Sequence, residues 1–361
     1  MDREVTRLMH LIDQGQALYE AQHYEDAWER LSLAIRMVED GEDEPLSDSV
    51  TAQLYVLRGS ALLYQDEPQA YQDPDIFHQV QSDYEQAIEL EPEKLLFYKL
   101  RARLLMSARF EDYTEAAAAD LERAIALDPH DTDALKLLAQ IALRHEAYEL
   151  AMEYLDQALE AGADAEGWLL RGVCYFKQSP PRYELAAADF GRALPLMPET
   201  EELYIWRAQC FQELGRVDEA IAEYDRLLRV APGRADYYVD RGALYAALRN
   251  PRALEDYNRA LTIEAHPLAY NNRAFYYLEA GDYAAALADA EQALRLAPQA
   301  PVVHATLAEI YARTRQPESM YRHLEQALPR YAGEDALELL MGPAFEPYRA
   351  EDRFQQLVRS F

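Results

Sequence analysis

Residues 204–232 read YIWRAQCFQELGRVDEAIAEYDRLLRVAP, and this stretch decides the fold. Small and apolar residues recur every three or four positions in two runs, 204–211 and 220–227, which is the periodicity of a buried helix face. Gly215 stands between the runs, and Pro232 follows the second, where its fixed φ and missing N–H end a helix. The stretch therefore predicts two helices joined by a tight turn.

The same pattern recurs along nearly the whole chain. A small residue that lets two helices approach closely marks nine first helices, at Gly15, Gly59, Ala102, Ala139, Gly172, Ala208, Gly242, Ala274 and Ala308. A second series marks the helices that follow them, at Ala34, Ala87, Ala124, Ala158, Ala193, Leu227, Ala260, Ala293 and Ala327. From Ala124 onward, successive members of this series are 33 to 35 residues apart.

The spacing Tyr-x2-Arg-Ala-x2-Phe, then Ala-x3-Tyr, then Pro resembles the tetratricopeptide repeat (TPR), with Arg207 where that signature usually has leucine. The resemblance, of the bacterial tandem-array type, covers about residues 8–332. It implies an all-α fold, a right-handed α-α superhelix (solenoid) of about nine helical hairpins whose first helices line a concave groove. Because one hairpin cannot bury its apolar face alone, stacked neighbours are expected to share a core.

Departures from the repeat predict how the chain is organised. Residues 1–41 form the first repeat, 42–51 an acidic linker, and 52–332 repeats two to nine. An insertion at about 65–77 separates the helices of the second repeat, either as a tolerated surface loop or as a binding feature. Apolar residues at helical spacing in 333–361 predict capping helices that cover the open end of the stack.

Composition limits the class of protein. A net charge of −30 argues against nucleic acid as a partner, because phosphates require clustered lysine and arginine. No apolar run approaches the roughly 18–20 residues of a membrane span, and the first residues lack the pattern of a signal peptide. We therefore expect a cytoplasmic protein without a membrane partner. Cys174 and Cys210 occupy equivalent places in successive repeats and are expected to be buried free thiols.

A charge pair is predicted inside the repeats. Six repeats place arginine directly before the small residue of the first helix and an acid directly before the packing residue of the second. These pairs are Arg58 with Asp83, Arg101 with Asp120, Arg171 with Asp189, Arg207 with Glu223, Arg241 with Asp256 and Arg273 with Asp289. The other three repeats lack both members. Because arginine can meet a carboxylate through two hydrogen bonds, we expect structural salt bridges within each hairpin.

The position before each arginine is expected to face the groove, together with neighbouring positions on the same helices. The predicted groove residues are Val56, Leu57, Leu100, Leu137, Leu169, Leu170, Ile205, Trp206, Val239, Asp240, Asn271, Asn272 and Phe275. An exposed apolar stripe in an acidic protein favours an interaction site. The alternative is that its leucines pad contacts between adjacent first helices. The asparagines are similar to those of TPR modules that clamp C-terminal carboxylates, but the accompanying lysines are missing, so no such clamp is expected.

The sequence contains no Gly-rich phosphate loop, no G-x-S-x-G elbow and no H-E-x-x-H motif, and its eight histidines lack ligand spacing. We therefore predict a non-catalytic protein without cofactor or metal. The expected function is a protein–protein interaction scaffold, monomeric or weakly dimeric, that binds a segment of another protein or a peptide in the groove. Two alternatives stay open: a structural solenoid that assembles into a homo-oligomer, and a peptide-sensing regulatory protein. The identity of the partner does not follow from the residues.

Overall fold

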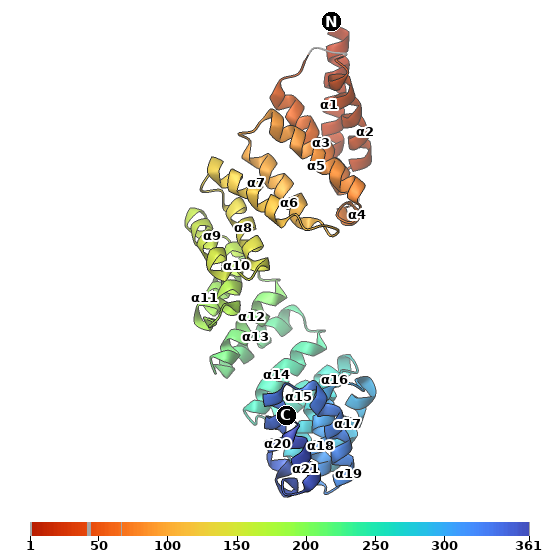
Figure 1. The fold of residues 1–361 in the computed structure, drawn as a ribbon, viewed down its shortest axis with the longest axis vertical. Helices are drawn as coiled ribbons and strands as arrows, with labels where there is room; N and C mark the ends of the chain where they lie inside the picture. The colour runs from red at the N-terminus through yellow and green to blue at the C-terminus, as the bar shows by residue number, and fades with distance from the viewer. Residues whose placement is uncertain (1, 42–44, 66, 361) are drawn as a thin grey trace. The chain divides into compact units, whose positions relative to one another are not determined.

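The computed structural model describes residues 2–41, 45–65 and 67–360, and within these ranges the chain is helical and has no strand. Met1, residues 42–44, residue 66 and Phe361 lie outside the described residues. They fall in the predicted first repeat, linker, insertion and cap. The chain divides into two compact units, Met1–Leu196 and Met197–Phe361. Figure 1 shows the antiparallel helix pairs of which both units are made. The prediction of an all-α array of TPR-type hairpins is confirmed.

The N-terminal unit contains five hairpins, and in the first four the second helix also packs on the first helix of the next hairpin. The pairs are α1 (Asp2–Glu20) with α2 (Tyr24–Glu39), α3 (Asp48–Gln65) with α5 (Pro74–Leu90), α6 (Leu95–Ser107) with α7 (Thr114–Leu127), α8 (Thr132–Arg144) with α9 (Tyr148–Ala161), and α10 (Ala165–Lys177) with α11 (Tyr183–Ala193). A one-turn helix, α4 (Glu67–Ala70), lies in the connection between α3 and α5.

The C-terminal unit contains four hairpins and a cap. The pairs are α12 (Glu201–Glu213) with α13 (Val217–Val230), α14 (Ala235–Ala247) with α15 (Arg252–Ile263), α16 (Pro267–Glu279) with α17 (Tyr283–Leu296), and α18 (Pro301–Arg313) with α19 (Pro317–Ala327). The cap consists of η1 (Leu328–Arg330), α20 (Gly333–Met341), η2 (Pro343–Tyr348) and α21 (Asp352–Arg359). Its residues Ala336, Leu340, Phe345 and Phe354 are buried in one cluster with residues of α18 and α19. This cluster covers the apolar face that the last hairpin would otherwise expose.

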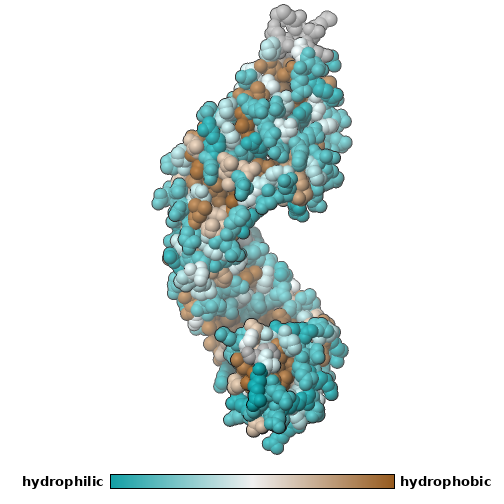
Figure 2. All heavy atoms as spheres, viewed as in Figure 1, coloured by the Kyte–Doolittle hydropathy of each residue, from teal (hydrophilic) through white to brown (hydrophobic). Residues whose placement is uncertain are grey.

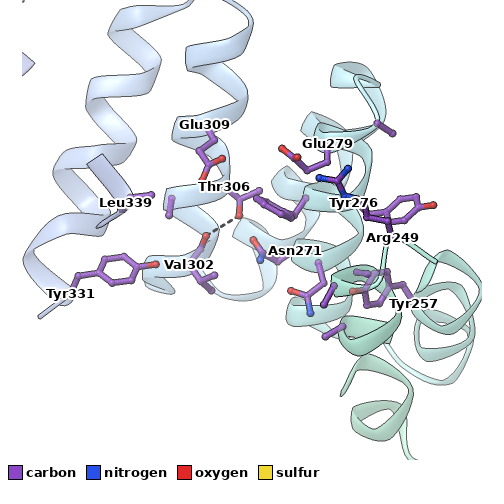
Figure 3. A pocket seen from close by; sticks show the side chains of 17 residues that line it. Arg249, Tyr257, Asn271, Tyr276, Glu279, Val302, Thr306, Glu309, Tyr331 and Leu339 are labelled. Carbon is purple, nitrogen blue, oxygen red and sulfur yellow. Dashed lines mark hydrogen bonds between the residues drawn. The ribbon is translucent and has the colours of Figure 1, made fainter. Parts of the chain in front are cut away.

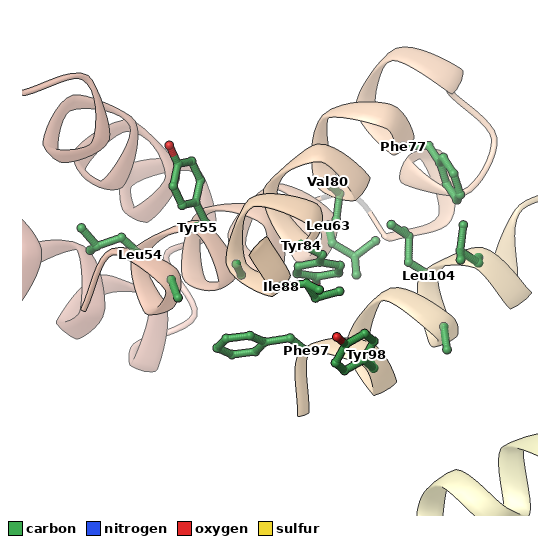
Figure 4. Close-up of a cluster of buried hydrophobic side chains, with 14 of the residues drawn as sticks. Leu54, Tyr55, Leu63, Phe77, Val80, Tyr84, Ile88, Phe97, Tyr98 and Leu104 are labelled. Carbon is green, nitrogen blue, oxygen red and sulfur yellow. The ribbon is translucent and has the colours of Figure 1, made fainter. Parts of the chain in front are cut away.

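Neighbouring hairpins share their core. In the N-terminal unit, Leu54 of α3, Tyr84 of α5 and Phe97 of α6 belong to one buried cluster, shown in Figure 4. Close approach within a hairpin requires a small residue: a Cβ on Gly172 of α10 would lie 2.6 Å from a ring carbon of Phe190 of α11, which is fully buried. The small residues of the repeat therefore have a steric cause.

In six of the nine described hairpins, the turn between the two helices uses a residue in the left-handed region. In the sixth hairpin Gly215 has a φ of 71°, its N–H donates to the Gln212 carbonyl at 2.9 Å, and the Arg216 N–H donates to the Phe211 carbonyl at 2.7 Å. This is the Schellman arrangement, which satisfies carbonyls at the helix end. The same conformation occurs at residues without glycine's freedom, at Gln22, Glu146, Arg249 and Arg315.

The helix bounds correct two predicted boundaries. The linker predicted at 42–51 is too long, because α3 already begins at Asp48. The insertion predicted at 65–77 ends at Asp73, whose carboxylate accepts hydrogen bonds from the backbone N–H groups of Asp75 (2.9 Å) and Ile76 (3.4 Å). An aspartate N-cap followed by proline at the first helical position starts a helix. The sequence pattern placed this start one turn too late.

The shortened insertion and the first turn of α5 both pack against the next repeat. Phe77 is fully buried, with its ring edge-on to Phe110 at 5.1 Å and stacked on Tyr113 at 5.3 Å. The Arg109 N–H donates to the Tyr71 carbonyl at 3.1 Å. These contacts give the connection a structural role, and a binding role for it stays a prediction.

The two cysteines are buried and free, as predicted. Burial raises the pKa of each thiol, Cys174 and Cys210, to about 12, so both stay protonated and unreactive near neutral pH. No helix in the described part of the chain is both long enough and apolar enough to cross a membrane.

Candidate functional site

All the predicted groove residues lie on first helices, namely α3, α6, α8, α10, α12, α14 and α16. Their exposure differs: Leu137, Val239 and Asn271 are buried, Asp240 and Phe275 are exposed, and the others are half-buried. Figure 2 shows that hydrophilic residues cover most of the visible surface, with hydrophobic patches between them. The structure brings two subsets of the predicted residues to the walls of cavities, one in each unit.

The larger of these two cavities lies in the C-terminal unit and has a volume of about 790 Å³. Asn271, Asn272 and Phe275 line it from α16, all three predicted from the sequence. Residues of α14 and α18 complete the wall, and Tyr331 and Leu339 of the cap segment border it (Figure 3). The cap residues were missed from the sequence, because the cap does not follow the repeat and its register on the groove cannot be read from periodicity.

Helix starts fix which side chains face this cavity. Pro267 opens α16, where the His266 ring accepts a hydrogen bond from the Ala269 N–H at 3.3 Å, and Pro301 opens α18. Counting from Pro301, the residues Val302, Thr306 and Glu309 fall on one helix face and line the cavity together. The Thr306 hydroxyl donates to the Val302 carbonyl at 3.1 Å, the dashed line in Figure 3.

Two acceptors in the cavity wall lack partners. Asn271 is 3% exposed, and its Oδ1 has no hydrogen-bond donor among the described residues. Within the same residues Glu309 makes no hydrogen bond or ion pair. Burial raises the pKa of Glu309, and the charge of Glu279 raises it further against the opposing effect of Arg313. Arg313 is itself engaged, donating to the Glu279 carboxylate at 2.8 Å.

A second cavity of about 510 Å³ shares part of this wall, including Phe275, Glu309 and Tyr331. Asp335 and Glu338 of α20 add carboxylates to its lining. The two cavities together are lined by four carboxylates, Glu279, Glu309, Asp335 and Glu338, and by two guanidinium groups, Arg249 and Arg313. The combined site is therefore aromatic, amide-bearing and net acidic.

The N-terminal unit has a cavity of about 360 Å³ that includes the predicted groove residues Leu100 and Leu137. Leu63 and Tyr84 add apolar wall, and Arg144 is held by a 3.0 Å hydrogen bond to the Met106 carbonyl. Neither of these two cavities is lined by the remaining predicted groove residues, Val56, Leu57, Leu169, Leu170, Ile205, Trp206, Val239 and Asp240.

The structure brings the members of all six predicted charge pairs together. Five pairs are fork-to-fork, with the arginine Nε and Nη2 donating to the two carboxylate oxygens, at Arg58–Asp83, Arg101–Asp120, Arg171–Asp189, Arg241–Asp256 and Arg273–Asp289. In each pair the carboxylate is buried and the arginine is half-buried.

The sixth pair differs from the others. Arg207 Nη1 lies 3.3 Å from Glu223 Oε1, and that oxygen accepts a 2.5 Å hydrogen bond from Arg226. Arg207 Nε and Glu223 Oε2 are buried without a partner among the described residues. Glutamate has one more methylene than aspartate. Its carboxylate oxygens therefore do not lie opposite Nε and Nη2 of the arginine as the aspartate oxygens do.

Sequence reasoning missed a third partner of several arginines. Arg171 also donates to Asp156 at 2.6 Å, Arg241 to Asp225 at 2.6 Å, and Arg273 to Asn258 at 2.5 Å. Each acceptor belongs to the second helix of the preceding hairpin, so one arginine joins three helices. The acceptors share one repeat position, but that position does not vary together with the arginine. Glu122 and Glu291 occupy it where no arginine follows, and Gly191 occupies it before Arg207.

One group of acids and a histidine has ligand-like spacing. Asp236, Glu264 and His266 place one ligand atom each within 4.8 Å of one another. His266 Nε2 lies 2.8 Å from Asp236 Oδ1, while Nδ1 accepts the Ala269 N–H. A metal on Nε2 would require a hydrogen on Nδ1, which that accepted hydrogen bond forbids. The arrangement therefore suits a helix cap oriented by Asp236 better than a metal site.

Comparisons with known proteins agree with this fold. The HSP-interacting protein of Zea mays is 32% identical over 114 residues, covering 31% of this chain and 15% of the relative. Anaphase-promoting complex subunit 3 of Schizosaccharomyces pombe is 21% identical over 285 residues, covering 74% of this chain and 42% of the relative. The chain spans less than half the length of the curated relatives it matches.

A solved structure covers more of the chain, and a family model identifies its repeats. The C-terminal part of a TPR repeat-containing protein from Cytophaga hutchinsonii superposes with a TM-score of 0.52 at 18% identity, covering 82% of this chain and 98% of that chain, which shows the fold alone. A model described as "Tetratricopeptide repeat" matches residues 110–174, 182–248 and 277–342, and a second one with the same description matches 153–200. These matches extend over more than half of the chain, which belongs to the tetratricopeptide repeat family.

Proposed function

We propose that the protein is a non-catalytic scaffold that holds a segment of another protein against the first helices of its hairpins. The observation that carries this proposal is the cavity of about 790 Å³ in the C-terminal unit. Its volume lies within the range of ligand pockets, about 300–1,000 Å³. Its wall joins apolar and aromatic surface with a few polar groups, and Asn271 offers an acceptor that has no partner among the described residues.

The relatives support the same class of function. The names of two of them describe an HSP-interacting protein and a subunit of the anaphase-promoting complex. Both names denote proteins that contact other proteins, and we carry over only this general property. The partner is proposed here as a protein or peptide segment; a cytoplasmic location and the lack of a cofactor stay predictions.

The proposed binding surface has a defined centre. Phe275 is 43% exposed on α16 and borders both cavities of the C-terminal unit, so it is the natural apolar anchor. Leu100 and Leu137 would form a second contact in the N-terminal unit. The other predicted groove residues would contribute complementary surface where they are half-buried or exposed.

The experiment is a selection of peptides from a phage-displayed library on the wild-type protein, followed by affinity measurements on single variants. Phe275→Ala should weaken the selected peptides at least about tenfold, a loss of about 1.4 kcal/mol. Leu296→Ala is the matched control, because Leu296 is 45% exposed on α17, the second helix of the same hairpin. Undiminished binding to Phe275→Ala would contradict the proposed site.

Sedimentation of the same variants tests the competing proposal of a homo-oligomer. A scaffold that uses this surface for partners should sediment as a monomer or weak dimer whose state is unchanged in Phe275→Ala. A stable oligomer that dissociates only in Phe275→Ala would assign the surface to self-association instead.

A further inference from the structure

We infer that the partner segment inserts a cationic side chain, arginine or lysine, into the cavity of the C-terminal unit beside Glu309. This inference rests on the proposed function, because it specifies the occupant of the same cavity. It is carried by the unsatisfied acceptors of the wall, by the charge of the lining and by the aromatic side chains around Glu309.

The unsatisfied acceptors call for hydrogen-bond donors from the partner. Glu309 has no hydrogen bond or ion pair within the described ranges, and Asn271 Oδ1 is an orphaned acceptor in the wall of the same cavity. A carboxylate can only accept when ionised. A half-buried carboxylate without a partner is costly, and a cation with several N–H groups would relieve that cost.

The charges around Glu309 also favour a cationic side chain. Three further carboxylates line the two adjoining cavities, and of the two guanidinium groups Arg313 is already bound to Glu279. Burial and the charge of Glu279 both disfavour the ionised form of Glu309, and the charge of Arg313 offsets them only in part. A cation from outside would find net negative charge, and an anionic side chain would be repelled.

The aromatic walls favour a long cationic side chain over a small ion. Figure 3 shows Tyr331 and Leu339 on one side of the cavity, Asn271 and Tyr276 on the other, and Glu309 on the helix between them. The alkyl stem of an arginine or lysine would lie against such apolar walls while its head reached Glu309. A planar guanidinium additionally stacks on aromatic rings, so arginine fits better than lysine.

The test uses fluorescein-labelled heptapeptide pools with random flanks and one fixed central residue, which is arginine, lysine, citrulline, leucine or glutamate. Citrulline keeps the shape of arginine without the charge. Fluorescence anisotropy should show the arginine pool binding wild type at least about tenfold more tightly than the citrulline pool, with the glutamate pool weakest. Raising the salt concentration should reduce the preference for arginine.

Glu309→Gln should abolish the preference for arginine over citrulline while the leucine pool binds as before. Glu334→Gln is the control, because Glu334 is an exposed acid of α20 that does not belong to either cavity lining. Equal binding of the arginine and citrulline pools to wild type, or a preference that survives in Glu309→Gln, would overturn the inference. The proposed function would still stand if Phe275→Ala weakened the leucine pool. Failure of every pool to bind would overturn both.

Discussion

Arg171 donates two parallel hydrogen bonds to Asp189, from Nε to Oδ2 at 2.8 Å and from Nη2 to Oδ1 at 3.2 Å. Asp189 is 1% exposed, so its charge is compensated by protein groups rather than by water. The bond to Asp189 is the main cause of the raised pKa of Arg171. Because the guanidinium also reaches Asp156 of the preceding hairpin, the pair couples folding within a repeat to stacking between repeats.

Replacing one member of this pair should be strongly destabilising. Asp189→Ala leaves two arginines, Arg171 and Arg192, without their buried acceptor, and the free energy of unfolding should fall by about 3–5 kcal/mol. Urea denaturation followed by circular dichroism measures the change. Glu93→Ala is the control, because it breaks an exposed ion pair with Arg123 and should cost less than about 1 kcal/mol. An unchanged midpoint for Asp189→Ala would show that the pair contributes nothing.

Glu223→Asp should stabilise the protein. Aspartate at the five equivalent positions meets its arginine with two hydrogen bonds, whereas Glu223 leaves one of its own oxygens and Arg207 Nε unpaired. Satisfying both groups should add about 1 kcal/mol to the free energy of unfolding. The reciprocal change, Asp256→Glu, should lose a comparable amount. If the denaturation midpoints of Glu223→Asp and Asp256→Glu shifted in the same direction, the extra methylene of glutamate would not explain the poorer pairing of Glu223.

Glu146→Gly should also stabilise, through the backbone. Glu146 has a φ of 57°, in the turn position that Gly215 and Gly281 occupy in other hairpins. A side chain in this conformation costs roughly 1–2 kcal/mol, part of which is offset by the greater unfolded-state entropy of glycine, so a net gain of about 0.5–1 kcal/mol is expected. Gly281→Ala should lose about as much. If the free energy of unfolding fell in Glu146→Gly, the Glu146 side chain would contribute more stability than its backbone strain costs.

The fold could be predicted from the sequence because the hairpin repeats. Once the pattern is recognised in one hairpin, such as 204–232, the same pattern identifies the others. The charge pairs were predictable for the same reason. An arginine and an acid, such as Arg58 and Asp83, occur together in six repeats, and the other three repeats lack both. The cavity was only half predictable. Asn271 and Phe275 belong to the repeat, whereas Tyr331 and Leu339 belong to a cap whose docking is set by shape and not by period.

In the ninth hairpin Leu307 stands in place of the arginine and His323 in place of the acid, and His323 pairs with His304 instead. His304 Nε2 lies 3.0 Å from the Pro298 carbonyl and therefore carries the hydrogen, so His304 Nδ1 accepts from His323 Nδ1 at 2.9 Å. The His323 ring also stacks on Tyr311, with ring centroids 5.5 Å apart. Desolvation, together with the charges of His304 and Arg322, lowers the pKa of His323 to about 4.

Acidification should therefore loosen the ninth hairpin before the rest of the protein. The unfolded chain binds a proton at His323 near the ordinary pKa of 6.5, and the folded chain only near 4, so stability falls as the pH drops through that interval. With the ring half-exposed, a loss of about 1–2 kcal/mol is expected. Amide hydrogen exchange in α18 and α19, measured across this pH range, should show protection falling in wild type and much less in His323→Gln. An equal fall in both proteins would place the sensitive group elsewhere than at His323.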